Sequence, residues 1–153
     1  MSTRSHVHEE SFQASPEELF RHLLTPSSIR NWWSAARAVI VPKSGGAYAL
    51  AWGDSEDEPD YTSVATIRDF EPGRRFVLHD YRYDSKFGDL PFDADFVVEF
   101  LVEPHPDGAS LRVTQDGFPG GPEGDEFYAG CQQGWSDTFA GIRRFLGEQG
   151  SSD

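Results

Sequence analysis

The spacing of apolar residues divides the chain into a strand-rich middle and a helical end. From Asp125 to Leu146, mostly apolar side chains recur every three or four residues, the period of a helix that buries one face. These side chains are Phe127, Cys131, Trp135, Thr138, Phe139, Ile142, Phe145 and Leu146. The pattern predicts one long amphipathic helix that lies against a sheet.

Three glycines follow the edge of this apolar stripe. Gly130, Gly134 and Gly141 fall within about 40° of one another on a helical wheel. Each costs about 1 kcal/mol relative to alanine inside a helix, so their alignment requires a reason. Tight packing of the helix on the sheet and close approach of a ligand both explain it.

The first third of the chain predicts one strand and two short helices. Residues 6–13 have strand character, and the segment from Ser15 to Glu18 is a capping box with proline at the first helical position. The first helix is therefore expected at 16–24. A second start signal at Thr25 precedes a short helix that ends near Trp33.

The middle of the chain changes to a period of two, which is typical of half-buried strands. Two loops interrupt it: an acidic one at 54–60, expected to be solvated, and an irregular one at 84–93. The second loop contains Phe87, Leu90 and Phe92 and is interpreted as a flap. Strands are predicted at residues 38–41, 47–52, 61–70, 74–83, 96–103 and 109–116.

Composition and charge narrow the function. The 153 residues fit one domain with its core at about 7–147, and aromatic residues make up 14% of the chain. A formal charge of -13 argues against nucleic acid and anionic membranes. No apolar run is long enough to insert in a membrane, and the polar N-terminus lacks a secretory signal, so a cytoplasmic location is expected. Cys131 is the only cysteine, which excludes an intrachain disulfide.

Candidate reactive groups are few. His6 and His8 share a strand face and are interpreted as solvated terminal histidines, with a metal site as the alternative. His79, Tyr81 and Tyr83 share one face of the strand at 74–83, but Phe76 and Leu78 compete for the inward side, so the facing stays open. The same ambiguity applies to Tyr48 and Trp52. No motif for a metal or a cofactor is present, and none is expected.

Four carboxylates are candidates for a general base. They are Asp93, Asp95, Glu99 and Asp116. A lone carboxylate is more often a surface charge, and the sequence contains no order of residues typical of a hydrolase triad.

Several local patterns together resemble the START-like (SRPBCC) superfamily, in particular the group named after the C-terminal domain of the activator of Hsp90 ATPase. The resemblance covers about residues 7–147 and rests on the segments 14–20, Trp32-Trp33, 110–114 with Gly117-Phe118, and Gly134-Trp135. It implies an α+β helix-grip fold. In that fold a curved antiparallel sheet of about six or seven strands surrounds a long C-terminal helix, in the order β-α-α-β(5-6)-α, and leaves an apolar cavity between them.

The chain also departs from this group at two positions. Many relatives carry histidine where this sequence has Gln115 and Cys131, so roles that depend on those imidazoles do not carry over. The chain also has no room for the separate chaperone-binding domain of the eukaryotic co-chaperone. Chaperone activation is therefore not inherited from the family name.

The expected function is binding, sequestration or sensing of a small hydrophobic molecule, aromatic or polyketide-like, by a monomer or homodimer. The alternatives are an enzyme of the polyketide cyclase or hydrolase type, using His79, Tyr81 or an inward carboxylate, and a protein that contacts a chaperone through its acidic loop and exposed tryptophans. The residues expected to contact the ligand are Trp33, Tyr48, Trp52, His79, Tyr81, Phe96, Val98, Gln115, Phe118, Cys131, Trp135 and Phe139.

Overall fold

The computed structural model describes residues 3–33, 35–55, 57–88 and 95–150. In chain order the elements are β1 (Thr3–Phe12), α1 (Pro16–Leu24), α2 (Pro26–Trp32), β2 (Arg37–Ile40), β3 (Ala47–Trp52), β4 (Tyr61–Glu71), β5 (Arg75–Ser85), β6 (Val97–His105), β7 (Gly108–Pro119), a 3₁₀ turn (Pro122–Gly124) and α3 (Asp125–Gly150).

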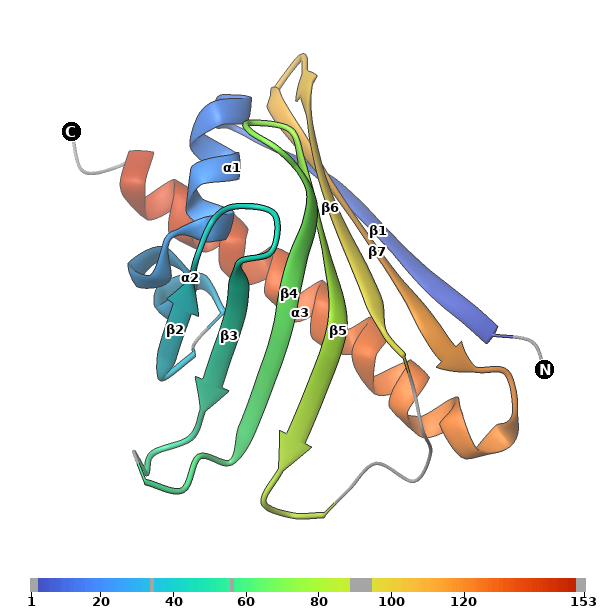
Figure 1. Cartoon of the computed structure of the whole chain (residues 1–153). Coiled ribbons are helices and arrows are strands. Elements are labelled where there is room, and N and C mark those ends of the chain that lie inside the picture. Colours follow the sequence, from blue (N-terminus) through green and yellow to red (C-terminus); the bar gives the residue numbers. More distant parts are fainter. Residues whose placement is uncertain (1–2, 34, 56, 89–94, 151–153) are drawn as a thin grey trace.

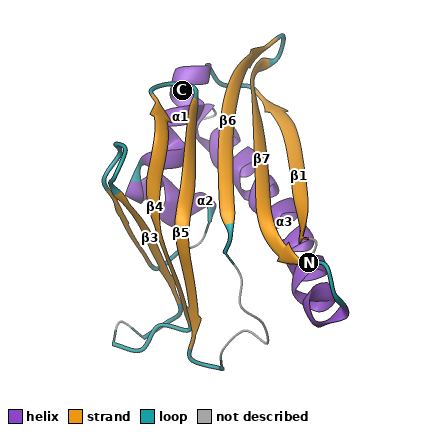
Figure 2. Cartoon of the chain, turned by 45° about the vertical axis from the view of Figure 1, so that its right-hand side comes forward, coloured by secondary structure: helices purple, strands orange, loops and turns teal. Residues whose placement is uncertain are grey.

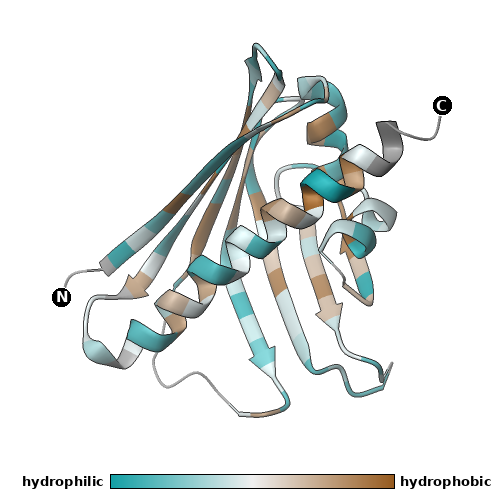
Figure 3. Ribbon diagram, turned by 180° about the vertical axis from the view of Figure 1, so that it is seen from behind, coloured by the Kyte–Doolittle hydropathy of each residue, from teal (hydrophilic) through white to brown (hydrophobic). Residues whose placement is uncertain are grey.

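The strands form one antiparallel sheet in the order β1-β7-β6-β5-β4-β3-β2. The sheet curves around α3, which crosses its concave face diagonally (Figures 1 and 3). Figure 2 shows the strands in front of the helix, with α1 and α2 beside its C-terminal half. This arrangement confirms the predicted α+β helix-grip fold.

The two short helices begin where the sequence predicts. Ser15 Oγ accepts a hydrogen bond from the backbone N–H of Glu18 at 3.1 Å, and proline occupies the first turn of each helix. Helix α2 ends at Trp32, and Trp33 is its C-terminal cap rather than a helical residue. The core therefore receives an apolar stripe from α1 and a tryptophan from α2.

A β-bulge in β5 resolves which side of this strand faces inward. Ala65 of β4 lies opposite both Asp80 and Tyr81, and Asp80 has a positive φ of 50°. One extra residue shifts the alternation of all side chains that follow it by one position.

The bulge lets both halves of β5 place aromatic or aliphatic side chains on the concave face. Phe76 and Leu78 belong to the hydrophobic core before the bulge, and Tyr81 packs against that core after it. Strict alternation predicts that His79 and Tyr81 share a face of the strand. Because the bulge lies between them, they do not. His79 is half-buried, and its Nδ1 lies 3.4 Å from Asp80 Oδ2.

Strand β3 faces inward through its larger side chains. Tyr48 and Leu50 are buried in the core, while the alanines that alternate with them, Ala47, Ala49 and Ala51, are only half-buried. The Tyr48 hydroxyl donates a hydrogen bond to the backbone carbonyl of Leu23 at 2.8 Å, so its polar tip has a partner within the core.

The loop expected at 84–93 begins later than predicted, because β5 continues to Ser85. Phe87 is 67% exposed and lies against the Tyr61 ring, with 5.6 Å between the ring centroids. Leu90 and Phe92, which supported the interpretation as a flap, lie outside the described residues.

Candidate functional site

A cavity of about 690 Å³ lies between α3 and the sheet, where β3 ends, β4 begins and β5 ends. Its lining combines aromatic rings with a few small polar groups. The lining residues are Trp33, Trp52, Tyr61, Ser63, Tyr81, Tyr83, Phe96, Gln115, Glu126, Phe127, Gly130, Cys131, Gly134, Trp135 and Thr138. Figure 3 shows α3 crossing the face of the sheet, with the start of β4 and the end of β5 on the side of its N-terminal half.

Helix α3 contributes one continuous wall of the cavity. Phe127, Cys131, Trp135 and Thr138 all line it, as their helical spacing requires. The glycines between them leave the space open: a Cβ atom added at Gly130 or Gly134 would meet no heavy atom within 4 Å. Two of the three aligned glycines thus border the cavity.

The third glycine has a different role. A Cβ atom at Gly141 would lie 2.3 Å from the backbone oxygen of Trp32, so only glycine permits this approach of α2 to α3. Tight packing therefore explains Gly141, and open space at the cavity explains Gly130 and Gly134.

Three tryptophans meet at one end of the cavity. The Trp33 ring lies 5.9 Å from the Trp52 ring and 5.7 Å from the Trp135 ring, measured between centroids. At the other end Phe127 contacts Phe96 and Tyr83, with centroid distances of 5.6 and 6.3 Å. Aromatic rings therefore bound the cavity at both ends.

The polar groups of the lining are held in place by the protein. Trp135 Nε1 donates to Gln115 Oε1 at 2.7 Å in a buried hydrogen bond, and Trp52 Nε1 donates to the Trp33 carbonyl at 3.2 Å. The Thr138 hydroxyl donates to the carbonyl of Gly134 at 2.8 Å. Since Gln115 Oε1 already accepts a bond, its amide N–H groups are the donors that it offers to the cavity.

The Tyr81 and Tyr83 hydroxyls and the Cys131 thiol of the lining are neutral at physiological pH. Burial raises the pKa of Tyr83 to about 12 and that of the Cys131 thiol to about 11. Burial also raises the pKa of Tyr81, although a hydrogen bond with Ser63 opposes the rise. These groups act as hydrogen-bonding partners rather than as nucleophiles or bases.

Seven of the predicted ligand contacts lie in the lining of the cavity: Trp33, Trp52, Tyr81, Phe96, Gln115, Cys131 and Trp135. The other five lie elsewhere. Tyr48, Val98 and Phe139 are buried in the core, and Phe118 is buried against Phe96 with 5.0 Å between the ring centroids. His79 precedes the bulge and lies on the other face of β5 from Tyr81.

Several lining residues were not predicted as ligand contacts: Tyr61, Ser63, Tyr83, Glu126, Phe127, Gly130, Gly134 and Thr138. The helical ones share the stripe of Trp135, so its period contained the signal for Phe127 and Thr138. Tyr61 and Ser63 carry no such signal, because β4 alternates like any half-buried strand.

The interpretation of His6 and His8 as solvated terminal residues is wrong. His6 is only 3% exposed and stacks on Tyr128 at 3.9 Å between ring centroids. Neither of its ring nitrogens has a hydrogen-bond partner, nor has Nε2 of His8. In the parts of the chain that the structure describes, no three His, Cys, Asp or Glu side chains are grouped to hold a metal ion.

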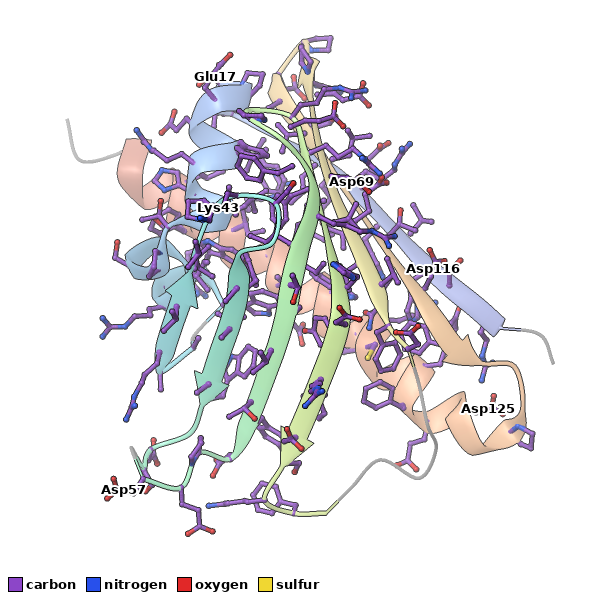
Figure 4. The ribbon with its side chains drawn as sticks, in the orientation of Figure 1. Glu17, Lys43, Asp57, Asp69, Asp116 and Asp125 are labelled. Carbon is purple, nitrogen blue, oxygen red and sulfur yellow. The ribbon has the colours of Figure 1, made fainter. Side chains whose placement is uncertain are left out.

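The three candidate bases that the structure describes, Asp95, Glu99 and Asp116, do not enter the cavity lining. Asp95 and Asp116 are exposed, and Figure 4 places Asp116 on β7, away from the helix. Glu99 forms an ion pair with Arg75 at 2.6 Å. Asp93 lies outside the described residues.

Solved structures with the same architecture were found by comparison. Protein MLL2253 from Mesorhizobium loti is 26% identical, with a TM-score of 0.76 over 98% of this chain and 99% of that one. The Aha1 dimer from Colwellia psychrerythraea is 14% identical, with a TM-score of 0.68 over 92% and 93% of the two chains. DynU16, a protein in the dynemicin biosynthetic locus, is 18% identical with a TM-score of 0.68 over 93% of this chain and 46% of that one.

The family of the chain follows from its sequence. No curated protein matches the sequence. Among the described helices, none has the length and apolar character needed to cross a bilayer. Residues 13–147 match the family described as Activator of Hsp90 ATPase homolog 1-like protein, which is most of the chain. Together with the helix-grip fold, this match shows that the chain belongs to the Activator of Hsp90 ATPase homolog 1-like family.

Proposed function

We propose that the protein binds a small, largely apolar molecule, aromatic or polyketide-like, in the cavity beneath α3. The observation that carries this proposal is the lining itself, in which eight of the fifteen residues are aromatic and two glycines of α3 leave the space open. A pocket of several hundred cubic ångströms with few fixed polar groups is typical of small-molecule sites.

The polar groups support orientation of a ligand rather than chemistry on it. Gln115 offers amide donors, while Tyr81 and Tyr83 offer neutral hydroxyls. These groups match a ligand carbonyl or hydroxyl. The occurrence of DynU16 in the dynemicin biosynthetic locus is compatible with a polyketide-like ligand for this chain.

The catalytic alternative has less support. It relied on His79, Tyr81 or an inward carboxylate. Neither His79 nor Asp95 belongs to the described lining, and burial raises the pKa of the Tyr81 hydroxyl, which disfavours its ionised form. The chaperone alternative relied on exposed tryptophans. Two of the four tryptophans are buried, and the other two, Trp33 and Trp52, are half-buried and line the cavity.

The test is ligand binding to the wild-type protein and to a variant whose cavity is filled. A hydroxymethyl derivative of anthracene is a neutral three-ring probe, followed by quenching of tryptophan fluorescence and by thermal shift. At a hundred times the dissociation constant, binding stabilises the fold by about 2.7 kcal/mol, which corresponds to roughly 5 to 11 °C for a chain of this size.

Gly134→Leu places a side chain in the open part of the cavity and should abolish the response. Gly147→Leu is the matched control, because Gly147 lies on the same helix, is exposed, has no atom within 4 Å of an added Cβ, and does not line the cavity. If neither this probe nor a broad set of apolar molecules changes fluorescence or melting temperature, the proposed function is wrong.

A further inference from the structure

The cavity carries no positive charge to receive an anion. Glu126, in the first turn of α3, is the one carboxylate among the described lining residues, and no lysine, arginine or histidine is among them. All 13 lysines and arginines of the sequence fall within the described ranges. The residues outside those ranges therefore add no lysine or arginine to the cavity.

The nearby base Lys86 is neutralised by a partner. Lys86 follows the end of β5, and its Nζ lies 2.8 Å from Asp60 Oδ1 and 5.4 Å from the centroid of the Phe87 ring. Because Phe87 in turn contacts Tyr61 at the cavity, Lys86 is a base close to the lining. Its charge is matched by Asp60 and does not offset Glu126.

Two of the three lining tryptophans, Trp52 and Trp135, present π systems rather than free N–H donors. The Nε1–H groups of Trp52 and Trp135 are both used in hydrogen bonds to protein acceptors. What these residues offer a ligand is therefore the aromatic ring, whose face carries partial negative charge and attracts cations. Tryptophan is the best of the aromatic residues for this interaction.

The length of the cavity sets the size of the ligand. Its helical wall extends from Glu126 to Thr138, and twelve residues of helix rise by about 18 Å. A molecule of three fused rings fits along this wall, with room for a substituent at either end. Glu126 borders one end and the three tryptophans border the other.

We propose that the cavity selects positively charged aromatic molecules over neutral and anionic molecules of the same shape. This inference rests on the proposed function, because it specifies the ligand of the same cavity. A cation gains attraction from the ring faces and from Glu126. An anion would lose its hydration against those faces and find neutral donors such as the Gln115 amide, but no positive charge, in return.

The test uses three anthracene probes that carry, at the same ring position, a trimethylammoniomethyl, a hydroxymethyl or a carboxylate group. Dissociation constants are measured by fluorescence at about 0.15 M and about 1 M salt, where the Debye length falls from about 8 to about 3 Å. The cation should bind about tenfold tighter than the carboxylate at both salt concentrations, with the alcohol between them. Interactions within the cavity persist at high salt, whereas attraction to the net charge of -13 does not.

Two variants with the same change of charge locate the preference. Glu126→Gln should lower the ratio of cation to alcohol affinity about threefold, since a single exposed charge at the rim of the cavity has a small effect. Asp57→Asn, on the exposed loop between β3 and β4, should leave the ratio unchanged (Figure 4).

The outcomes separate this inference from the proposed function. If the alcohol binds but the cation binds no tighter than the carboxylate, the inference is wrong and the proposed function stands. A preference that disappears at 1 M salt, or that both variants reduce equally, belongs to the net charge and also overturns the inference. If the wild-type protein binds none of the three probes, both the inference and the proposed function fail.

Discussion

Gly134 and Gly141 lie on the same helix and differ in what surrounds the position of a missing side chain. A Cβ atom at Gly141 would lie 2.3 Å from the carbonyl oxygen of Trp32, a backbone atom that moves only with α2. A Cβ atom at Gly134 would meet nothing within 4 Å. The same substitution, glycine to alanine, should therefore change the free energy of unfolding in opposite directions at the two positions.

The magnitudes follow from helix propensity and from packing. Alanine is favoured over glycine by about 1 kcal/mol inside a helix, and Gly134→Ala should gain most of this. At Gly141 the same gain is opposed by the displacement of α2, and inserting a methyl group into a packed contact costs about 1 to 3 kcal/mol. Since 2.3 Å is about 1 Å shorter than normal contact, the upper part of that range applies, and Gly141→Ala should lose about 1 to 2 kcal/mol.

The assay is urea unfolding of both variants, with the midpoint and the slope compared with those of the wild-type protein. An unchanged slope shows that the change in midpoint reports stability. The two variants should differ by about 2 to 3 kcal/mol in total. If Gly141→Ala is as stable as Gly134→Ala, α2 does not approach α3 as closely as described, and the steric argument is refuted.

Three further predictions concern buried polar groups and the bulge. Burial lowers the pKa of His6 and His8 below 6.5, so the unfolded chain binds more protons and the free energy of unfolding should fall as pH decreases below about 6.5. His6→Phe should weaken this pH dependence, which is measured by urea unfolding at several pH values. An identical dependence in the wild-type protein and the variant would contradict the prediction. Trp135→Phe removes the donor to Gln115 Oε1 and should lower the free energy of unfolding by about 1 to 3 kcal/mol. Adding Gln115→Leu should restore part of this loss in the double variant. A single variant as stable as the wild-type protein would exclude a role for this hydrogen bond in stability. Asp80→Val should be about 1 to 2 kcal/mol less stable than Asp80→Gly, because Asp80 has a φ of 50°; equal denaturation midpoints would mean that the bulge does not require this conformation.

The sequence by itself determined the elements whose signals are local. The capping box at Ser15 and the prolines fixed the starts of α1 and α2, because a helix terminus depends on only a few neighbouring residues. The stripe around Trp135 identified α3 and its buried face. The order of these elements, together with the resemblance of several segments to START-like proteins, predicted the helix-grip fold.

Only the tertiary structure decided which residues surround the cavity. The facing of Tyr81 depends on a bulge opposite Ala65, and a bulge is a property of two paired strands rather than of one sequence segment. His6 is buried because Tyr128, more than a hundred residues later, stacks on it. Gly134 and Gly141 look alike along the helix, and they differ only because α2 approaches one of them while the other borders open space. Contacts between distant segments set these outcomes, and no local period of the sequence encodes them.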